Sequence, residues 1–256
     1  MENFIISKNN KITKIWVLVF WILVWEIASL IISKEVYLPS PISTLKALMG
    51  LIVQVKFWNS VFMSILRVAM GFIISCIGGI LIGIICGLNR FFYELFNPLV
   101  ITIKSTPVIS FIIIALIWFE AGNVPIFICF LMCFPVIWTN VVQGIRGVDG
   151  NLLEMAKIYN VKKSLVIRDI YVPSITPYIS AGITMSLGLG WKVTVAAEVL
   201  SSPKFAIGMH LYNAKVYLET PEVFAWTGVV ILLSFGFEYL FKSMIKKRRL
   251  LNPDYS

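Results

Sequence analysis

Six ionisable side chains lie inside long apolar stretches of this 256-residue chain and are the first candidates for chemistry at membrane depth: Glu26, Arg67, Lys104, Lys192, Glu198 and Glu238. A charged group at the centre of a bilayer costs roughly 3 kcal/mol on insertion scales, so each one needs a partner or a polar surrounding. Lys192, which follows Trp191, allows two interpretations. It lines a polar path and attracts an anion, or it belongs to a charge pair that holds helices together. Arg67 has two candidate partners, Glu26 and Glu198.

A second concentration of polar residues is the segment 147–173, a polar island in an apolar chain. Asn151 and Glu154 have the spacing of a capping box, which predicts a short helix with an apolar surface. That helix should stop at Asn160, because asparagine tolerates the left-handed conformation of helix ends. A second helix is expected at 162–171 and should end at Pro173. The island is therefore predicted to form a rigid knuckle of two short helices that meets a soluble partner.

The composition places both features in a membrane protein. Hydrophobic residues make up 59% of the chain and charged residues 14%, and the mean hydropathy is +0.88, which is too apolar for a soluble domain of this length. A spanning helix needs about 20 largely apolar residues. Six segments reach or approach that length: 15–32, 61–88, 98–119, 124–145, 175–200 and 223–241. The fold class is predicted to be an all-α polytopic membrane bundle, with a kink or a short lead-in helix where Lys104 and Pro107 interrupt the third span.

Basic residues indicate how the spans are oriented. With the N-terminus in the cytosol, the inner segments hold most of the basic residues, and the outer segments hold only Lys34, Lys46, Lys56, Lys204 and Lys215. By the positive-inside rule we expect one transmembrane domain over 1–256, with a cytosolic N-terminus (1–14), a cytosolic island (147–173) and a basic cytosolic tail (242–256). The formal charge of +9 is spread among helix ends, which gives no support to nucleic-acid binding.

Two further segments help to position the charged residues. Ser40 before Pro41 is a typical helix start and predicts an amphipathic helix along the outer interface. The span at 61–88 has small residues at helical spacing, among them Gly79 and Gly83. Such residues let helices approach closely in lipid, so this span is expected at the centre of the bundle.

The remaining reactive residue types do not form a metal or catalytic site. The cysteines lie in apolar spans without histidine or carboxylate neighbours, which is typical of small buried residues: Cys76, Cys86, Cys129 and Cys133. The single histidine, His210, is expected to have a surface or packing role. A membrane-embedded enzyme would need a cluster of His, Asp or Ser at membrane depth, and the spans offer none. The predicted metal and catalytic sets are therefore empty.

Within the island, the spacing resembles the cytosolic signature of ATP-binding-cassette (ABC) importer permeases: Glu-Ala-Ala, three residues, Gly, nine residues, and Ile-x-Leu-Pro. This chain has Glu154-Met155-Ala156, three residues, Asn160, nine residues, and Ile170-Tyr171-Val172-Pro173. Met replaces the first alanine, Asn the glycine and Val the leucine. Asn in place of Gly preserves the turn chemistry.

The resemblance extends over nearly the whole chain and narrows to nitrate/sulfonate/taurine-type permeases through four motifs: Leu38-Pro39-Ser40-Pro41, Ser64 with Arg67 and Gly71, Trp118-Phe119, and Gly190-Trp191 with Ala196-Ala197-Glu198. It implies a coupling helix seated in a groove of a separate ATPase, formed by Leu153, Glu154, Met155, Ala156, Lys157, Ile158, Tyr159, Asn160 and Pro173. The alternative is a loop helix that packs on its own bundle. The candidates for the translocation path are Lys192, Glu198, Trp191, Arg67 and Lys104.

The same resemblance implies a set of partners. These are a second permease copy (a homodimer) or a close homologue, two ABC ATPase subunits, an extracytoplasmic substrate-binding protein, and the lipid of a bacterial cytoplasmic (inner) membrane. The chain has no Gly-x4-Gly-Lys-Ser/Thr phosphate loop, so no cofactor is expected on it, and ATP and Mg²⁺ would bind to the ATPase subunits. The chain is expected to be a permease and not an enzyme.

For the substrate, the resemblance implies a small organic anion of the sulfonate, taurine or nitrate class. A nitrogenous vitamin precursor is the alternative. In such importers the binding protein does most of the selecting. An ion-coupled secondary transporter is the rival class, but it predicts inverted repeats, and the sequence shows no convincing internal repeat.

Overall fold

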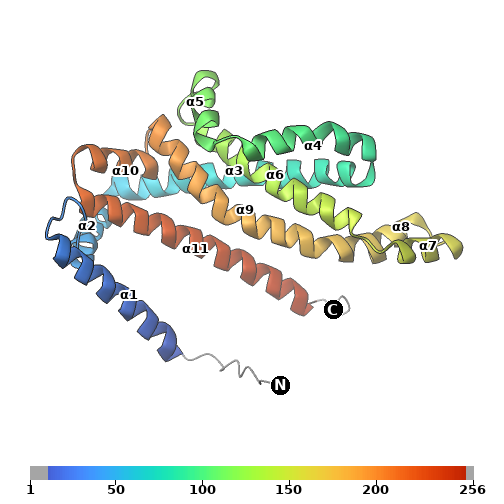
Figure 1. Cartoon of the computed structure of the whole chain (residues 1–256), viewed down its shortest axis with the longest axis horizontal. Coiled ribbons are helices and arrows are strands. Elements are labelled where there is room, and N and C mark those ends of the chain that lie inside the picture. Colours follow the sequence, from blue (N-terminus) through green and yellow to red (C-terminus); the bar gives the residue numbers. More distant parts are fainter. Residues whose placement is uncertain (1–10, 252–256) are drawn as a thin grey trace.

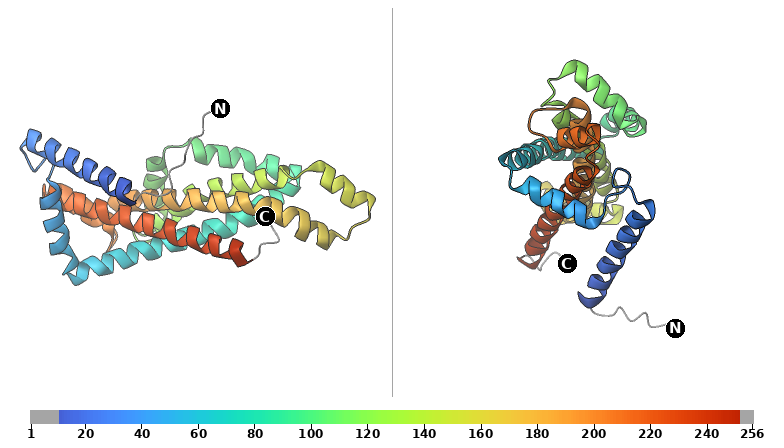
Figure 2. Two further views of the ribbon diagram at one scale, coloured as in Figure 1. Left: turned by 90° about the horizontal axis from the view of Figure 1, so that it is seen from below. Right: turned by 90° about the vertical axis from the view of Figure 1, so that its left-hand side faces the viewer.

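The structure is a computed structural model that describes residues 11–251, and the regular elements in this range are helices (Figure 1). In chain order they are α1 (Lys11–Ile32), α2 (Pro41–Ile52), α3 (Val55–Leu88), α4 (Arg90–Ser105), α5 (Val108–Trp118), α6 (Val124–Arg146), α7 (Gly150–Ile158), α8 (Lys163–Val166), the π-helix η1 (Ile167–Tyr171), α9 (Val172–Ser201), α10 (Ile207–Val216) and α11 (Thr220–Leu251). The molecule is elongated, with α7 and α8 at one extremity and α10 near the other (Figures 1 and 2). We call these extremities the α7 end and the α10 end.

Five helices in the described range are long and apolar enough to cross a membrane, namely α1, α3, α6, the continuous helix Lys163–Ser201 and the segment Thr220–Phe241 of α11. The predicted interruption of the third span, 98–119, near Lys104 and Pro107 is confirmed. The span is divided between α4 and α5, which are bent by 104° relative to each other and make a sixth crossing only when they are counted together. Thr106 precedes Pro107 and has an extended backbone (φ −82°, ψ 133°), because a residue before proline is driven out of the helical region. The prediction of a polytopic helical bundle is confirmed.

Glycines on α3 set its distance from α6 at the centre of the molecule. A β-carbon at Gly79 would lie 2.9 Å from Cβ of Ile137, and one at Gly83 would lie 2.9 Å from Cβ of Val141. Side chains do not tolerate such distances, so the absence of a β-carbon permits this close approach. The expectation that this span is central is therefore confirmed. Because α9 packs along α6 and also contacts α3, these three helices form one close-packed unit, which we call the central unit.

The other helices surround the central unit. α2 begins as predicted: the Ser40 side chain accepts a hydrogen bond from the backbone N–H of Ser43, and Pro41 lies in the first turn. α1 stands apart along most of its length (Figure 2). Near its end the Trp25 ring stacks on Phe224, with centroids 5.8 Å apart. Its other large apolar side chains are mostly exposed, which suits contact with lipid.

The start of the island helix differs from the prediction. Asp149, rather than Asn151, is the N-cap, and its Oδ1 atom accepts the backbone N–H of Asn151 at 2.9 Å. The helix therefore begins at Gly150. Aspartate is among the residues that cap helices best, so the carboxylate two residues earlier competes successfully with the expected asparagine.

The expected helix end at Pro173 was wrong. The backbone N–H of Val172 bonds to the carbonyl of Ile167, five residues back, and this wider π-turn leads directly into α9. A proline in a regular helix clashes with the carbonyl four residues earlier, and a π-turn at that place relieves the clash. The continuous helix Lys163–Ser201 has 39 residues, or roughly 58 Å at about 1.5 Å per residue. Because the hydrocarbon core is only about 30 Å thick, this helix is long enough to carry α7 beyond the membrane.

Candidate functional site

α7 carries most of the residues that the sequence assigned to coupling, and its last turn is closed by two backbone hydrogen bonds. The N–H of Asn160 bonds to the carbonyl of Lys157 at 3.1 Å, and the N–H of Val161 bonds to that of Ala156 at 2.9 Å. Asn160 has a φ of 49°, which places it in the left-handed region that glycine and asparagine adopt at helix ends. The predicted helix stop at Asn160 is confirmed, and asparagine replaces the signature glycine without changing the turn.

The outward surface of α7 is apolar. Met155 is 47% exposed, and Ile158 and Tyr159 are each 76% exposed, whereas Ala156 is only 4% exposed. Leu153 is half-buried, and Glu154 and Lys157 are exposed at the sides of this surface. Pro173 lies in the first turn of α9, outside α7. Because large apolar side chains outside a membrane mark contact sites when they gather, the exposed set Met155, Ile158 and Tyr159 forms a candidate docking face.

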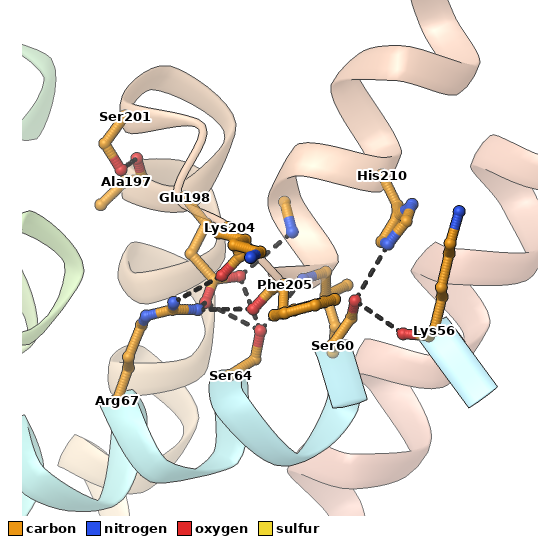
Figure 3. Close-up of polar contacts among 12 residues, drawn as sticks. Lys56, Ser60, Ser64, Arg67, Ala197, Glu198, Ser201, Lys204, Phe205 and His210 are labelled. Atoms are coloured by element: carbon orange, nitrogen blue, oxygen red, sulfur yellow. Dashed lines mark hydrogen bonds and ion pairs between the residues drawn. The ribbon is translucent and has the colours of Figure 1, made fainter. Parts of the chain in front are cut away.

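A buried ion pair lies at the α10 end (Figure 3). Nη1 of Arg67 on α3 lies 3.0 Å from Oε1 of Glu198 on α9, and the two side chains are only 5% and 0% exposed. The Ser64 hydroxyl lies 2.8 Å from both carboxylate oxygens, and the backbone N–H of Gly208 donates to Oε2 at 3.1 Å. Of the two partners that the sequence offered for Arg67, the structure selects Glu198.

The same network holds the loop between α9 and α10. Arg67 donates from Nη1 to the carbonyl of Phe205 at 3.0 Å and from Nη2 to the carbonyl of Lys204 at 3.1 Å. The Ser64 hydroxyl accepts the backbone N–H of Ile207 at 3.0 Å. Phe205 has a φ of 52°, an unfavourable conformation for a non-glycine residue that persists where surrounding contacts determine it. A buried network that is well satisfied specifies one arrangement of the chain, so α3 fixes this loop.

Gly208 is a member of this network that sequence reasoning missed. A β-carbon there would lie 2.5 Å from Cβ of Glu198 and 2.6 Å from the carbonyl oxygen of Val195. The absence of a β-carbon therefore permits α10 to approach α9 closely. No signal in the sequence pointed to Gly208 itself. The network could have been suspected from α3, where Ser60, Ser64 and Arg67 follow one another at spacings of four and three residues and so share one polar helix face.

His210 packs beside this network. Its Nε2 atom lies 2.9 Å from the Ser60 hydroxyl, and its ring stacks on the Trp226 indole with centroids 4.8 Å apart and planes 6° from parallel. Burial, together with nearby Lys56, lowers the pKa of His210 below its ordinary value of 6.5. Of the surface and packing roles that the sequence left open, the structure shows the packing role.

Trp191 and Lys192 project from different sides of α9. Trp191 is fully buried and lies edge-on to Phe237, with ring centroids 5.5 Å apart. Lys192 is exposed, and its amino group has no carboxylate partner among the side chains that the structure describes. The interpretation of Lys192 as one half of a charge pair is therefore not supported by any carboxylate in the described part of the chain.

Lys104 is the other exposed lysine among the path candidates. It lies in the last turn of α4, just before the bend, and its Nζ atom is 3.2 Å from the Thr139 hydroxyl on α6. The five candidates therefore divide into two groups. Lys104 and Lys192 are exposed, whereas Arg67, Trp191 and Glu198 are buried inside the chain.

The fold and these sites define a polytopic helical membrane protein with a locked loop at one end and an exposed helical knuckle at the other. A family comparison makes the class specific. The chain belongs to the family of binding-protein-dependent transport system inner membrane components, whose model matches residues 79–249.

Several curated transport permeases are similar to this chain. SsuC of Bacillus subtilis (strain 168), assigned by name to aliphatic sulfonate transport, is 29% identical over 217 residues, which cover 84% of this chain and 78% of SsuC. The nitrate import permease NrtB of Synechocystis sp. is 29% identical over 237 residues, covering 88% of this chain and 85% of NrtB. The bicarbonate transport permease CmpB of Synechococcus elongatus is 31% identical over 159 residues, covering 62% of this chain and 57% of CmpB.

The chain is therefore a permease subunit of an ABC importer, a multi-pass protein of the inner membrane whose family transports and does not catalyse. Membership in this family implies an ATPase and a substrate-binding protein as partners. It decides against the ion-coupled transporter that the sequence analysis kept as a rival.

Proposed function

We propose that this permease couples to a separate ATPase through α7, which seats its docking face in a groove of that subunit. The observation that carries the proposal is the exposure of Met155, Ile158 and Tyr159 at the extremity of the molecule. Covering apolar surface gains about 25 cal/mol per Å², so this face favours a protein partner. Because the chain leaves it uncovered, the alternative of a helix that packs on its own bundle is weaker. Lys157 at its side would steer acidic groups of the ATPase.

The proposed assembly places the α7 end and both termini in the cytosol. Lys157, Lys162 and Lys163 at the knuckle support this orientation, because basic loops stay on the inner side. Each chain would act over 1–256 as one permease domain, in a homodimer or beside a close homologue. Two ABC ATPase subunits would carry ATP and Mg²⁺, and an extracytoplasmic binding protein would deliver the substrate at the α10 end.

The proposed cycle needs no covalent chemistry on the substrate. Binding of ATP closes the two ATPase subunits on each other, and their movement brings the two knuckles together. Because α7 is connected to α6 and α9, this movement would turn the whole central unit. The path would then open to the other side of the membrane. Arg67, Glu198 and Trp191 act in this scheme by holding α9 and α10 in place around the path.

The proposed substrate is a small anion of the sulfonate, taurine or nitrate class. Lys192 and Lys104 are exposed cations on helices at membrane depth, and an anion is the ligand that such groups attract. SsuC, NrtB and CmpB are named for aliphatic sulfonates, nitrate and bicarbonate, all of which are anions. A nitrogenous vitamin precursor that carries a positive charge is the weaker alternative, because the lysine side chains are also positive and offer it no counter-charge.

Substitution of one docking-face residue tests the coupling proposal. Ile158→Asp places a carboxylate in the middle of the exposed apolar face, and central interface residues commonly contribute 2 kcal/mol or more, or about 30-fold in affinity. We expect the tagged permease to retain its helicity and to lose the co-purifying ATPase subunit. Asn151→Asp, an equally exposed site at the start of α7, is the matched control and should retain it. An ATPase that stays bound to the Ile158 variant would refute the proposal.

A second substitution tests the path. Lys192→Met keeps most of the length of the side chain and removes its charge. We expect normal assembly and normal ATPase activity with loss of uptake of the anion that co-purifies with the binding protein. Failure of the subunits to assemble would instead assign Lys192 to structure.

A further inference from the structure

The last residue of α6 carries a charge that rests on an aromatic stack. The guanidinium carbon of Arg146 lies 3.6 Å from the centre of the Tyr93 ring. Tyr93 also stacks on the Trp138 indole, with centroids 5.7 Å apart and planes 8° from parallel. Among the side chains that the structure describes, Arg146 has no carboxylate partner. The aromatic face is therefore the principal neighbour of this charge.

The three groups join two parts of the molecule. Trp138 and Arg146 belong to α6, whereas Tyr93 is in the first turn of α4. Only residues 147–149 separate Arg146 from α7, so the stack lies directly beside the knuckle. Figure 1 shows the start of α4 and the end of α6 on the same side of the molecule, toward α7.

The last turn of α6 is tightly held on its other sides. A β-carbon at Gly87 of α3 would lie 2.8 Å from Cβ of Ile145, and one at Gly144 would lie 3.0 Å from Cβ of Tyr178 on α9. Close packing of this kind has little slack, so a displacement of α7 moves the end of α6 together with α3 and α9. The start of α4 is held at this level by the Tyr93 ring and its two neighbours, and by apolar packing in the cluster that joins Tyr93 to Cys86 of α3 and Trp138 of α6.

α4 leads directly to the bend of the molecule. The 104° angle between α4 and α5 makes this pair the least regular part of the membrane region, and Lys104 lies beside the bend. A force applied to the start of α4 would act on this angle at Pro107, which has no N–H to donate to α4, although the Thr106 N–H still bonds to the carbonyl of Thr102 at 3.1 Å.

We propose that Tyr93 is a positioning residue that transmits movement of the knuckle, through Arg146 and Trp138, to the bent pair α4–α5. The inference rests on the proposed coupling function of α7. The stack connects the rigid central unit, which follows the ATPase, to the segment that changes shape. Stacked faces slide more readily than interlocked side chains, so the link holds the two parts together while it permits a change of angle.

The test uses the complete complex of permease and ATPase subunits in proteoliposomes. A single reactive thiol at the end of α5 is introduced by Glu120→Cys, an exposed site, in a Cys76→Ala background. The other native cysteines are buried. The rate of maleimide labelling is measured without nucleotide and after trapping with ATP and vanadate. We expect trapping to change this rate, and a rate that does not respond to ATP would overturn the proposal.

Two pairs of variants then examine the stack. Tyr93→Leu removes the ring and Tyr93→Phe keeps it, whereas Arg146→Gln removes the cation and Arg146→Lys keeps it. We expect Tyr93→Leu and Arg146→Gln to reduce the ATP-dependent change by between about twofold and thirtyfold, the range that mutations along a coupling path produce. The two conservative variants, Tyr93→Phe and Arg146→Lys, should retain the ATP-dependent change of the parent. An undiminished response in Tyr93→Leu and Arg146→Gln, or an equal loss in Tyr93→Phe, would refute the link.

Co-purification of the ATPase subunit separates this inference from the proposed function. All four stack variants should retain the ATPase, because they leave the docking face unchanged. If Ile158→Asp also retains it, the coupling proposal fails. If Ile158→Asp loses it and the stack variants respond normally to ATP, only the transmission role fails. Should Tyr93→Leu fold poorly, the exposed Arg146 pair decides the question.

Discussion

The two ends of the central unit hold their arginines in different ways. At the α10 end, Arg67 is buried, pairs with Glu198 at 3.0 Å and also donates to two backbone carbonyls. At the α7 end, Arg146 is exposed and rests on the Tyr93 ring at 3.6 Å. The first arrangement depends on the direction of several hydrogen bonds, whereas the second needs only that two flat groups stay in contact. The difference suggests a fixed end and an adjustable end.

Magnitudes support this distinction. Removing one partner of a buried ion pair typically costs about 3–5 kcal/mol, because the other charge stays buried without compensation. An exposed cation over an aromatic ring contributes only about 0.5–1 kcal/mol. Under the proposed function both kinds of contact are useful, since the α10 end would keep its shape while the α7 end moves with the ATPase. Substitutions at the two ends should therefore differ in their effect on stability, with the largest loss at the α10 end.

The largest effect is expected at the fixed end. Glu198→Ala leaves the guanidinium of Arg67 buried without its carboxylate and removes the acceptor of the Gly208 N–H. We expect a loss of about 3–5 kcal/mol, seen as a lower midpoint of thermal unfolding in detergent and a lower yield of folded protein. Glu94→Ala is the matched control, because Glu94 pairs with Arg90 at 2.8 Å on an exposed surface. An ion pair in water contributes little, and no measurable loss is expected there.

A double variant decides whether the charge or the volume matters at this site. Replacing Arg67 and Glu198 together by methionine removes both buried charges and keeps most of the packing. Buried pairs are often replaced by apolar residues at little cost, so the double variant should be more stable than Glu198→Ala. If it is less stable, the loop contacts of Arg67 outweigh the penalty of its charge.

The next effect is expected midway between the two ends. Gly79→Ala places a β-carbon 2.9 Å from Ile137, and overpacking of this kind typically costs about 1–3 kcal/mol. Gly236→Ala on α11 has no atom within 4 Å of the new carbon and should be neutral or slightly stabilising, because alanine favours helix. Thermal unfolding of both variants measures the difference. Equal melting temperatures would show that α3 and α6 are not held at a fixed distance.

Much of this architecture could be predicted from sequence because it depends on local patterns. Hydropathy located the spans, the Ser40–Pro41 pair located the start of α2, and the spacing around Asn160 located the end of α7. Gly79 and Gly83 indicated a closely packed helix. Each of these inferences uses residues within one or two helical turns of each other.

The parts that were missed depend on distant contacts or on exact backbone geometry. Arg67 and Glu198 are 131 positions apart, so the sequence offered Glu26 equally well. The break at Pro107 was predicted, but its angle of 104° was not, because hydropathy and the position of a proline carry no information on the size of a bend. A π-turn before Pro173 has no established sequence pattern, and the general rule that proline ends a helix therefore gave the wrong answer there.

A smaller effect is expected at the turn of the knuckle. Asn160 has a φ of 49°, and a β-branched residue in this conformation loses roughly 1–2 kcal/mol. We expect Asn160→Val to unwind the end of α7 and to weaken ATPase binding, measured by titration of the ATPase subunit, without lowering the melting temperature of the bundle. Asn160→Gly should bind at least as well as the parent, because glycine adopts this conformation freely. Weakened binding by both variants would point to a direct contact of the Asn160 amide instead.

The smallest effect is expected from protonation of His210. Its pKa in the folded protein is lowered by burial and by Lys56, so the unfolded chain binds a proton more readily than the folded one. Stability should therefore be complete above the unfolded pKa of about 6.5 and should decline as the pH falls from there toward the lowered folded pKa. His210→Gln keeps a hydrogen-bond partner for Ser60 and does not titrate. Melting temperatures between pH 5 and 8 should show a shallower acid-side decline in this variant, and an unchanged decline would assign the pH dependence to other groups.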